Sequence, residues 1–419
     1  MKRIASLFSI AVIVLASCQK EDMELGIAEG IDAHAGSKYI SLTKAQADLT
    51  ASANIFAFKL FNQVRVDRNG EAILLSPFSA SMALGMTATG AEGETERQMR
   101  AVLGFGEVTK EEMTEYYSKM LDGLAKADPY VDLKIANSIW IHKDFPVKEA
   151  FVRNAEKAFD SIIENRDFGS PATLKEINDW VSDKTEGTIK DLLDELSPDA
   201  RMALVNALYF EGKWRYAFAG SKKAPFSNAS GGRTRTDMMY AVGTLSYADR
   251  DGWELLRLPY GTGAFSMSII LPPEGVKFQG TTLDYDRWLS LNGTLRPCEV
   301  NMNIPAFMTR DEFNLIDPLK ALGMTDAFGM NADFSAMSDK ALYIGKVKQK
   351  TFIEVSETGT KASAATVVEM RLRGANPGGY DVPEYQPEKV NFDADRPFYF
   401  VISEVSTKSV LFIGQVTEL

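Results

Sequence analysis

The sequence ETGTKASAATVVEMRLR, residues 357–373, decides how the rest of the chain is interpreted. Strand side chains alternate between two faces, and one face of this stretch carries only small or β-branched residues. They are Thr360, Ala362, Ala364, Thr366 and Val368. The alternation predicts a β-strand, and an ordinary half-buried strand would satisfy it. The stretch ends at Arg373 and runs into the turn-rich sequence GANPGG (374–379), a combination typical of an exposed site for proteolytic cleavage.

Length alone suggests two or three domains and also allows one large domain, and the lack of a repeat or linker favours one continuous unit. The chain has 419 residues, of which 45% are hydrophobic and 25% charged, and it shows no internal repeat and no long linker. Its net charge of −11 argues against a nucleic-acid partner, because phosphate binding needs clustered Lys and Arg.

The first 18 residues have the features of a targeting segment. Lys2 and Arg3 precede an apolar run that is too short for a stable transmembrane helix. The ending Leu-Ala-Ser-Cys (15–18) resembles a bacterial lipoprotein cleavage motif, which would make Cys18 the lipidated N-terminus of the mature chain. A plain secretory signal is the alternative. With lipid, residues 19–43 are expected to tether the domain to a membrane, at the outer membrane, the cell surface or the periplasm.

Common catalytic and metal sites have few candidate residues. The chain holds only two histidines, His34 and His142, and two cysteines, Cys18 and Cys298. Neither HExxH, paired CxxC, GxSxG nor a P-loop occurs. A hydrolase or zinc enzyme is therefore not expected, and Cys298 is best explained as a small buried hydrophobe.

Periodicity predicts an α+β fold, with helices dominating the first third of the chain and strands the rest. Residues 45–66 are predicted as a helix, and a second helix is predicted after Ser76 as its capping residue. Residues 219–235 are predicted as a polar loop, and Asp317 as the cap of a short helix. Asn137 and Asn206 lie within apolar strands, so each needs hydrogen-bond partners.

Several motifs together resemble the serpin family from about Lys44 to the C-terminus. They are SPFSASMALGMTATGAEGET (76–95), ANSIW (136–140), NDWVSDKTEGTIKDL (178–192), LVNALYFEGKW (204–214), LRLPYG (256–261), SMSIILP (266–272), FDADRPFYFVI (392–402) and LFIGQV (411–416). The resemblance implies a single domain over residues 44–419, with three β-sheets, about nine helices and an exposed reactive-centre loop at about 357–380. It also implies a monomeric protease inhibitor, with no enzymatic activity, no cofactor and no metal.

Serpins act as suicide substrates. The resemblance implies that a target protease attacks the loop, forms an acyl-enzyme, and is trapped when the loop inserts into the large sheet as a new strand. The loop hinge would comprise Glu357, Gly359, Thr360, Ala362, Ser363, Ala364 and Ala365.

Counting from the hinge places the scissile bond at Arg373-Gly374, with Arg371 and Met370 as fallback positions. An Arg there suits trypsin-like serine proteases, with Arg-specific cysteine proteases as further candidates. About ten residues more than usual separate Gly374 from Asp395, which leaves the exact bond open.

The resemblance also implies a region where the large sheet parts. Its residues are Ser76, Ser79, Asn137, Asn206, Trp214 and Gln349. Gln349 replaces a His that contacts the Asn of this region in many members. A glutamine amide can donate and accept, so the same contact can form without pH sensitivity. The alternative function is a non-inhibitory serpin, a binding or structural protein whose loop is cleaved as a substrate. The small residues at 362–365 favour inhibition.

Overall fold

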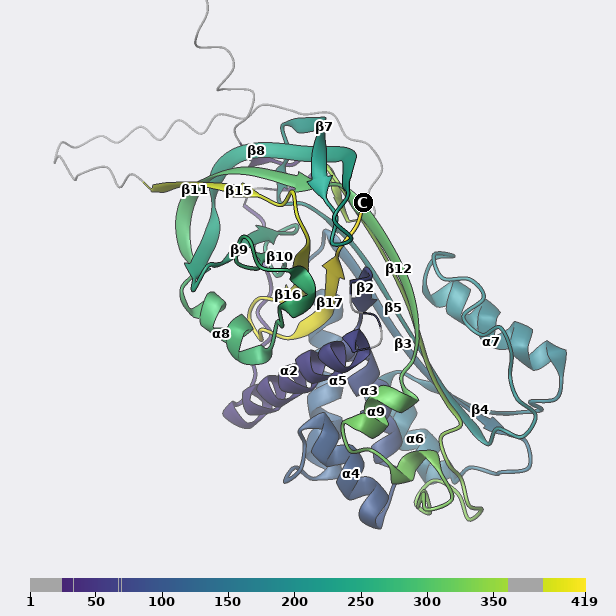
Figure 1. Cartoon of the computed structure of the whole chain (residues 1–419). Coiled ribbons are helices and arrows are strands. Elements are labelled where there is room, and N and C mark those ends of the chain that lie inside the picture. Colours follow the sequence, from purple (N-terminus) through teal and green to yellow (C-terminus); the bar gives the residue numbers. More distant parts are fainter. Residues whose placement is uncertain (1–24, 33, 67, 69, 361–386) are drawn as a thin grey trace, which may run out of the picture.

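The structure is a computed structural model that describes residues 25–32, 34–66, 68, 70–360 and 387–419. Its three β-sheets have six, nine and two strands, and five of the helices lie before residue 160 (Figure 1). The α+β class and the three predicted sheets are confirmed. The eight α-helices of the described residues are α2 (Lys44–Arg65), α3 (Pro77–Ala88), α4 (Gly93–Leu103), α5 (Lys110–Lys126), α6 (Glu149–Phe159), α7 (Pro171–Lys184), α8 (Tyr285–Gly293) and α9 (Ile316–Ala321).

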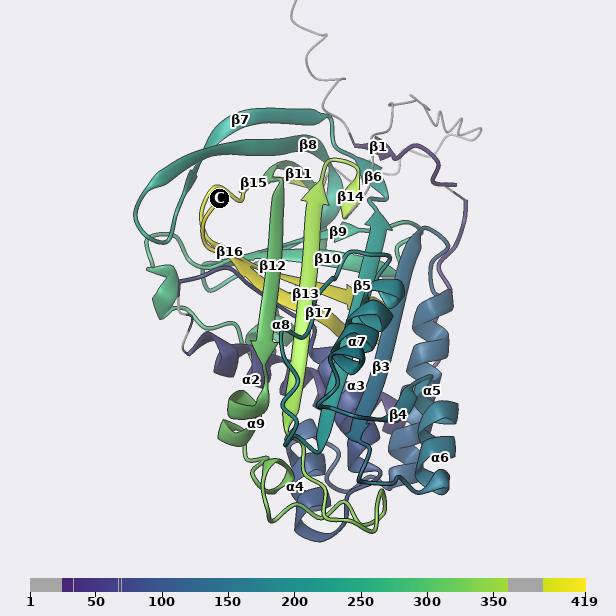
Figure 2. The same cartoon turned by 90° about the vertical axis from the view of Figure 1, so that its right-hand side faces the viewer.

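The six-stranded sheet forms one long face of the molecule (Figure 2). Its strands, in spatial order, are β12 (Phe307–Asn314), β13 (Lys346–Ser356), β14 (Gly359–Thr360), β5 (Met202–Lys213), β3 (Val131–His142) and β4 (Ile162–Arg166). Strands β13 and β5 also pair directly with each other, so the short β14 lies between them over only part of their length.

The nine-stranded sheet contains most of the C-terminal half of the chain. Its order is β15 (Glu388–Asp393), β11 (Arg296–Pro305), β8 (Arg233–Arg250), β9 (Trp253–Pro259), β10 (Phe265–Leu271), β16 (Phe398–Glu404), β17 (Val410–Val416) and β2 (Ile73–Leu75), with β7 (Gly220–Ser227) paired to β8. Strands β10, β16 and β17 are buried along their whole length, which matches their nearly continuous apolar sequences.

Helix α3 lies in the core between the two large sheets. Every residue of Pro77–Ala88 is buried, and the helix contacts β3 and β5 on one side and β17 on the other. A helix that is apolar all round is expected in such a position. On the opposite, outer face of the six-stranded sheet, α7 covers β3 and β5 (Figure 2).

Part of the region expected to be a tether lies against the domain. Gly26–Ile27 (β1) pairs with Tyr216–Ala217 (β6) to form the two-stranded sheet. Leu25 packs over Gly243, where an added Cβ would lie 2.7 Å from the Leu25 Cβ. We call residues 25–42 the N-terminal strap. No helix in the described part of the chain is long and apolar enough to cross a membrane.

Three local predictions are wrong. Residues 219–235, expected to be a polar loop, largely form the hairpin of β7 and the start of β8. Ser76 precedes α3 without capping it, because its hydroxyl donates to the Leu411 carbonyl oxygen at 3.0 Å. Asp317 lies inside α9, whose N-cap is Leu315.

Candidate functional site

The candidate site is a seam in the six-stranded sheet that is closed at its lower end and open above. At the lower end, Lys346–Gln349 of β13 pairs in parallel with Ala203–Asn206 of β5. Beyond this ladder the two strands diverge. Among the described residues, positions 350–354 of β13 and 207–211 of β5 have no ladder partner across the seam.

Strand β14 occupies the upper end of this seam. The chain turns at residues 357–358, after which Gly359–Thr360 pairs with Ser356 and Val355 of β13. The same two residues pair on their other side with Lys213 and Gly212 of β5. Because a paired strand needs about 4.8 Å on each side, β13 and β5 are two strand spacings apart here and one spacing apart at Gln349.

Gly359 is required by this turn. Its φ of +147° is a conformation that residues with a side chain rarely adopt. A Cβ at this position would also collide with the carbonyl oxygen of Gly212 and lie 2.9 Å from the Lys213 Cα. Only glycine lets the chain enter the seam at this point.

Thr360 is the deepest described residue of the loop hinge. Its side chain is 1% exposed, and its hydroxyl lies 2.7 Å from the Tyr260 hydroxyl. Burial raises the pKa of Tyr260 well above its usual value, so the phenol stays neutral and can share this hydrogen bond.

Trp214 fixes the turn that leads into the hinge. Its indole Nε1–H donates to the Ser356 carbonyl oxygen at 2.8 Å, and its backbone N–H donates to the Thr358 carbonyl oxygen at 3.3 Å. The indole stacks on the Tyr260 ring with centroids 4.4 Å apart. The structure therefore places Trp214 at the entrance of the seam.

Three amide side chains lie side by side at the point where the seam closes. Asn137 of β3 is opposite Asn206 of β5, which is opposite Gln349 of β13. Asn206 Nδ2 donates to Asn137 Oδ1 at 2.6 Å, and Asn206 Oδ1 accepts from the Ser79 hydroxyl. Asn137 Nδ2 lies 2.9 Å from the Met82 sulfur. The buried asparagines thus have the partners that their burial requires.

Gln349 does not make the contact with Asn206 that the sequence allowed. Its Oε1 accepts from the Ser76 N–H at 2.9 Å, and its Nε2 donates to the Ser76 carbonyl oxygen at 2.8 Å. The backbone just before α3 offers one donor and one acceptor, and the amide satisfies both. The prediction that Gln349 bonds Asn206 is therefore wrong, because Ser76 takes up its hydrogen bonds.

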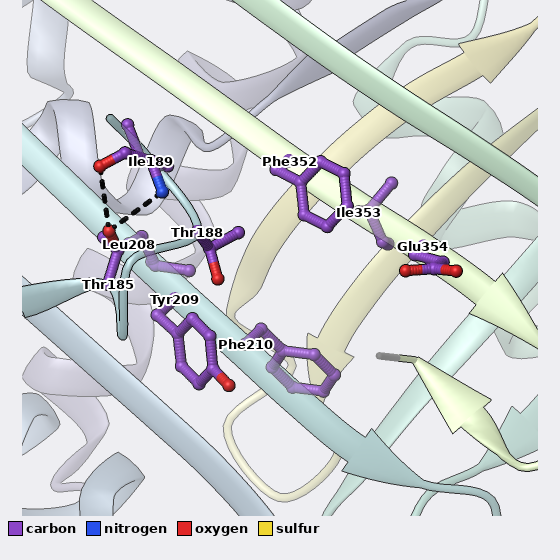
Figure 3. Close-up of a pocket in the computed structure, with 9 residues that line it drawn as sticks. All are labelled: Thr185, Thr188, Ile189, Leu208, Tyr209, Phe210, Phe352, Ile353 and Glu354. Atoms are coloured by element: carbon purple, nitrogen blue, oxygen red, sulfur yellow. Dashed lines mark hydrogen bonds between the residues drawn. The ribbon is translucent and has the colours of Figure 1, made fainter. Parts of the chain in front are cut away.

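The open part of the seam contains a pocket of about 270 Å³ (Figure 3). Leu208, Tyr209 and Phe210 line it from β5, and Phe352, Ile353 and Glu354 from β13. Thr185, Thr188 and Ile189, which follow α7, line its remaining side. Below the pocket, β13 and β5 pair directly at Gln349 and Asn206, so the two strands must separate before another strand can pass between them.

The outer rim of the seam is acidic. Glu211 of β5 and Glu354 of β13 flank the opening directly below Thr360. The Tyr209 hydroxyl donates to the Glu211 carboxylate. Burial is the larger cause that raises the pKa of Tyr209, and the negative charge of Glu211 raises it further. A cation placed between the two carboxylates would therefore be favoured.

The structure places five residues of the predicted sheet-opening region together where the seam closes: Ser76, Ser79, Asn137, Asn206 and Gln349. The sixth, Trp214, lies apart from them at the entrance of the seam. It describes Glu357, Gly359 and Thr360 of the hinge. The other loop predictions, Ala362, Ser363, Ala364, Ala365, Arg373 and Gly374, lie outside the described residues, as does Cys18. In the described part there is no group of three or more His, Cys, Asp or Glu suited to a metal ion.

Sequence reasoning missed two parts of the site. They are Tyr260, which bonds Thr360, and residues 185–196, which lie over the seam. Tyr260 falls inside the motif LRLPYG (256–261), and the covering residues overlap NDWVSDKTEGTIKDL (178–192). Both motifs contributed to the resemblance, but nothing local in either indicates a contact with a strand about one hundred residues away or more.

Comparison with known proteins identifies the family. The sequence model described as Serpin (serine protease inhibitor) matches residues 51–419. An uncharacterised serpin-like protein of Methanosarcina acetivorans is 33% identical over 380 residues, which cover 88% of this chain and 87% of that protein. Neuroserpin of Gallus gallus is 32% identical over 378 residues, covering 85% and 88%.

A solved structure agrees with these relatives. The thermophilic serpin tengpin, in its native state, matches with a TM-score of 0.80 at 30% identity, over 94% of this chain and 100% of tengpin. The fold, the seam and the sequence relatives lead to one conclusion. The chain belongs to the serpin family, whose members generally inhibit serine proteases.

Proposed function

We propose that this serpin inhibits trypsin-like serine proteases by inserting its cleaved loop into the seam between β5 and β13. One observation carries the proposal: Gly359–Thr360 already pairs with both strands, so the hinge occupies the first two positions of a new strand. Below it, β13 and β5 form no ladder with each other until Gln349 and Asn206, so the seam offers room for further residues of the same chain once the strands part.

The reaction follows ordinary serine protease chemistry up to the acyl-enzyme. The protease serine attacks the carbonyl carbon at the reactive bond, and an ester replaces the peptide bond. The departing amine becomes the new N-terminus of the C-terminal fragment, which β15–β17 hold in the domain. Insertion of about a dozen residues, at roughly 1 kcal/mol per ladder hydrogen bond, then supplies the energy to distort the attached protease.

The register of β14 supports Arg373 as the residue that carries the ester. Thr360 lies opposite Gly212, so an antiparallel strand continued downward would bring residue 370 opposite Met202, the first residue of β5. Arg373 would then pass just beyond the lower end of the strand. With the ester on Arg373, a fully inserted loop would carry the protease over the 13 residues that follow Thr360, or about 44 Å. Cleavage at Met370 or Arg371 would shorten this path.

The decisive experiment mixes the protein with trypsin and resolves the products on a denaturing gel. A stable covalent complex, with release of a fragment that begins at Gly374, supports the proposal. Cleavage at the same bond without complex refutes it and favours the non-inhibitory alternative. An Arg-specific cysteine protease, tested in parallel, examines whether the second class of target is also trapped.

We further propose that the protein is exported as a bacterial lipoprotein anchored through Cys18. The motif at residues 15–18 supports this. Metabolic labelling with palmitate should mark the wild-type protein but not Cys18→Ser. Labelling of neither protein, with the Cys18→Ser chain still exported, would favour a plain secretory signal.

A further inference from the structure

Residues 212–236 carry six basic side chains and no acidic one, in a chain whose net charge is −11. The stretch runs from the upper end of β5 through β6 and β7 into the start of β8, and β7 and β8 lie at the top of the molecule in both views (Figures 1 and 2). A local excess of positive charge on an acidic protein marks a surface suited to an anionic partner. The six are Lys213, Arg215, Lys222, Lys223, Arg233 and Arg235.

The hairpin of β7 and β8 gathers three of these cations on one face. Pro225 lies opposite Arg235, and Lys223 lies opposite Asp237. In an antiparallel pair, directly opposite residues share a face, and so do residues two apart in one strand. Lys223, Arg233 and Arg235 therefore share a face, and all three are exposed. With the exposed neighbour Lys222, we call these residues the basic ribbon.

The other face of the hairpin is fixed to the domain. Phe226, at 0% exposure, packs against Phe398 of β16 with ring centroids 6.5 Å apart. The Ser227 N–H donates to the Asp395 carbonyl oxygen at 2.7 Å. The cations are therefore presented outward from a well-supported ribbon.

Most of the positive charge of the basic ribbon is not neutralised nearby. Lys223 pairs with Asp237 at 2.9 Å, and both side chains are more than half exposed. The Arg235 guanidinium donates to the Lys223 carbonyl oxygen, and the Lys222 ammonium lies 5.3 Å from the Tyr240 ring centroid. Among the described residues, Lys222, Arg233 and Arg235 form no ion pair with a carboxylate. Asp237 thus offsets one of four cations.

The N-terminal strap joins the domain beside the basic ribbon. The Leu25 N–H donates to the Val242 carbonyl oxygen of β8 at 2.7 Å. Arg235 precedes Val242 by seven residues in the same strand, a distance of at most about 23 Å. The chain between Cys18 and Leu25 spans a similar length, at most about 25 Å. A lipid on Cys18 would therefore keep the basic ribbon within reach of the headgroups.

We propose that the basic ribbon is a docking surface for anionic lipid headgroups. The inference rests on the proposed anchor at Cys18, which brings the ribbon to the bilayer, and it is independent of protease inhibition. Each Lys or Arg at an anionic membrane surface strengthens binding about fivefold. Three net charges then give roughly a hundredfold, which is weak for a free protein and sufficient for one that a lipid already tethers.

The test uses the chain from Gln19 to Leu419, which contains every described residue and carries no lipid. It measures cosedimentation with vesicles of phosphatidylcholine that contain about 30% phosphatidylglycerol. We expect binding at low salt, release in about 0.5 M salt and no binding to pure phosphatidylcholine.

Two variants of the ribbon and one control locate the contact. Arg233→Gln combined with Arg235→Gln should weaken binding about 25-fold, at fivefold for each cation. Lys222→Gln combined with Lys223→Gln, in the other strand, should weaken it at least as much, because Asp237 loses its partner. The matched control is Arg153→Gln combined with Lys175→Gln, which removes two exposed cations from α6 and α7, away from the ribbon (Figure 1). It changes the net charge equally and should bind like the wild type.

The outcomes separate membrane docking from the proposed function. Weaker binding in both ribbon variants alone, with unchanged midpoints of thermal unfolding and unchanged trapping of trypsin in solution, supports the proposal. Absence of wild-type binding to anionic vesicles, equal binding to neutral vesicles, or equal loss in the control overturns it. Vesicle binding retained in the ribbon variants, together with slower trapping of trypsin, would assign the ribbon to the protease and also overturns it. Failure of the wild type to trap trypsin would refute the proposed function and leave the vesicle result standing.

Discussion

A charge introduced at Thr360 tests whether the hinge enters the seam as the structure shows. The Thr360 side chain is 1% exposed on the core face and bonded to the Tyr260 hydroxyl. In Thr360→Arg a guanidinium would have to replace this hydroxyl in a buried position beside the neutral Tyr260 phenol. We expect the hinge to leave the seam, and the variant to be cleaved by trypsin without being able to trap it.

The contacts of the hinge set the size of the effect expected for Thr360→Arg. An uncompensated buried charge costs about 3–5 kcal/mol. The hinge gains about 1 kcal/mol for each ladder hydrogen bond along its two short edges and about the same for the Tyr260 contact. The penalty therefore matches or exceeds the stabilisation of the hinge. Slowing insertion by 3 kcal/mol is a factor of about 150, so hydrolysis of the acyl-enzyme should outcompete trapping.

The assay is the number of inhibitor molecules consumed per trypsin molecule inactivated. We expect this ratio to rise at least about tenfold in Thr360→Arg. Thr360→Ser retains the hydroxyl for Tyr260 and should behave like the wild type. If Thr360→Arg forms covalent complex with the wild-type ratio, insertion does not begin at β14 and the reasoning is refuted.

Two further predictions concern the seam. In an inserted loop that continues the β14 register, residue 361 would come opposite Glu211 and Glu354. Lys361→Glu should therefore raise the same ratio severalfold, and 1 M salt should weaken the effect; an unchanged ratio at low salt would contradict this register. In Gln349→His, the imidazole must stay neutral if it is to accept from the Ser76 N–H and donate to the Ser76 carbonyl oxygen. Its folded-state pKa is then depressed, so stability should fall as pH drops below about 6.5 in the variant and not in the wild type, measured by urea unfolding; equal pH profiles would argue against the Gln349 contacts.

Much of the fold was accessible from the sequence because it rests on local patterns. The two helices predicted over residues 45–66 and after Ser76 are observed as α2 and α3, close to the expected bounds. The hairpin of β7 and β8 was missed because its residues are polar, and an exposed ribbon has the composition of a loop.

The candidate site, like the fold, could be predicted from the sequence only in part. The sheet-opening residues could be named from the resemblance, and the structure places all of them along the seam, five where it closes and Trp214 at its entrance. The partner of Gln349 could not be named from the sequence. Gln349 bonds the backbone N–H and carbonyl oxygen of Ser76, and nearly every residue type carries these two groups. The hydrogen bonds of Lys350 could not be predicted either, since they reach carbonyl oxygens about 160 positions away in the sequence.

The N-terminal strap also determines which way the molecule would face if Cys18 carries lipid. Strand β1 pairs with β6, two residues after Trp214, at the same end of the domain as the hinge (Figure 2). Seven peptide steps separate Cys18 from Leu25, a reach of at most about 25 Å. The end of the domain that carries the hinge would then face the bilayer. Proteases working within a few nanometres of the lipid headgroups would meet it first, and large proteases in free solution would be screened by the membrane itself. A 20-residue spacer inserted before Leu25 should accelerate trapping of soluble trypsin by vesicle-bound protein; unchanged rates would mean that the anchor imposes no such orientation.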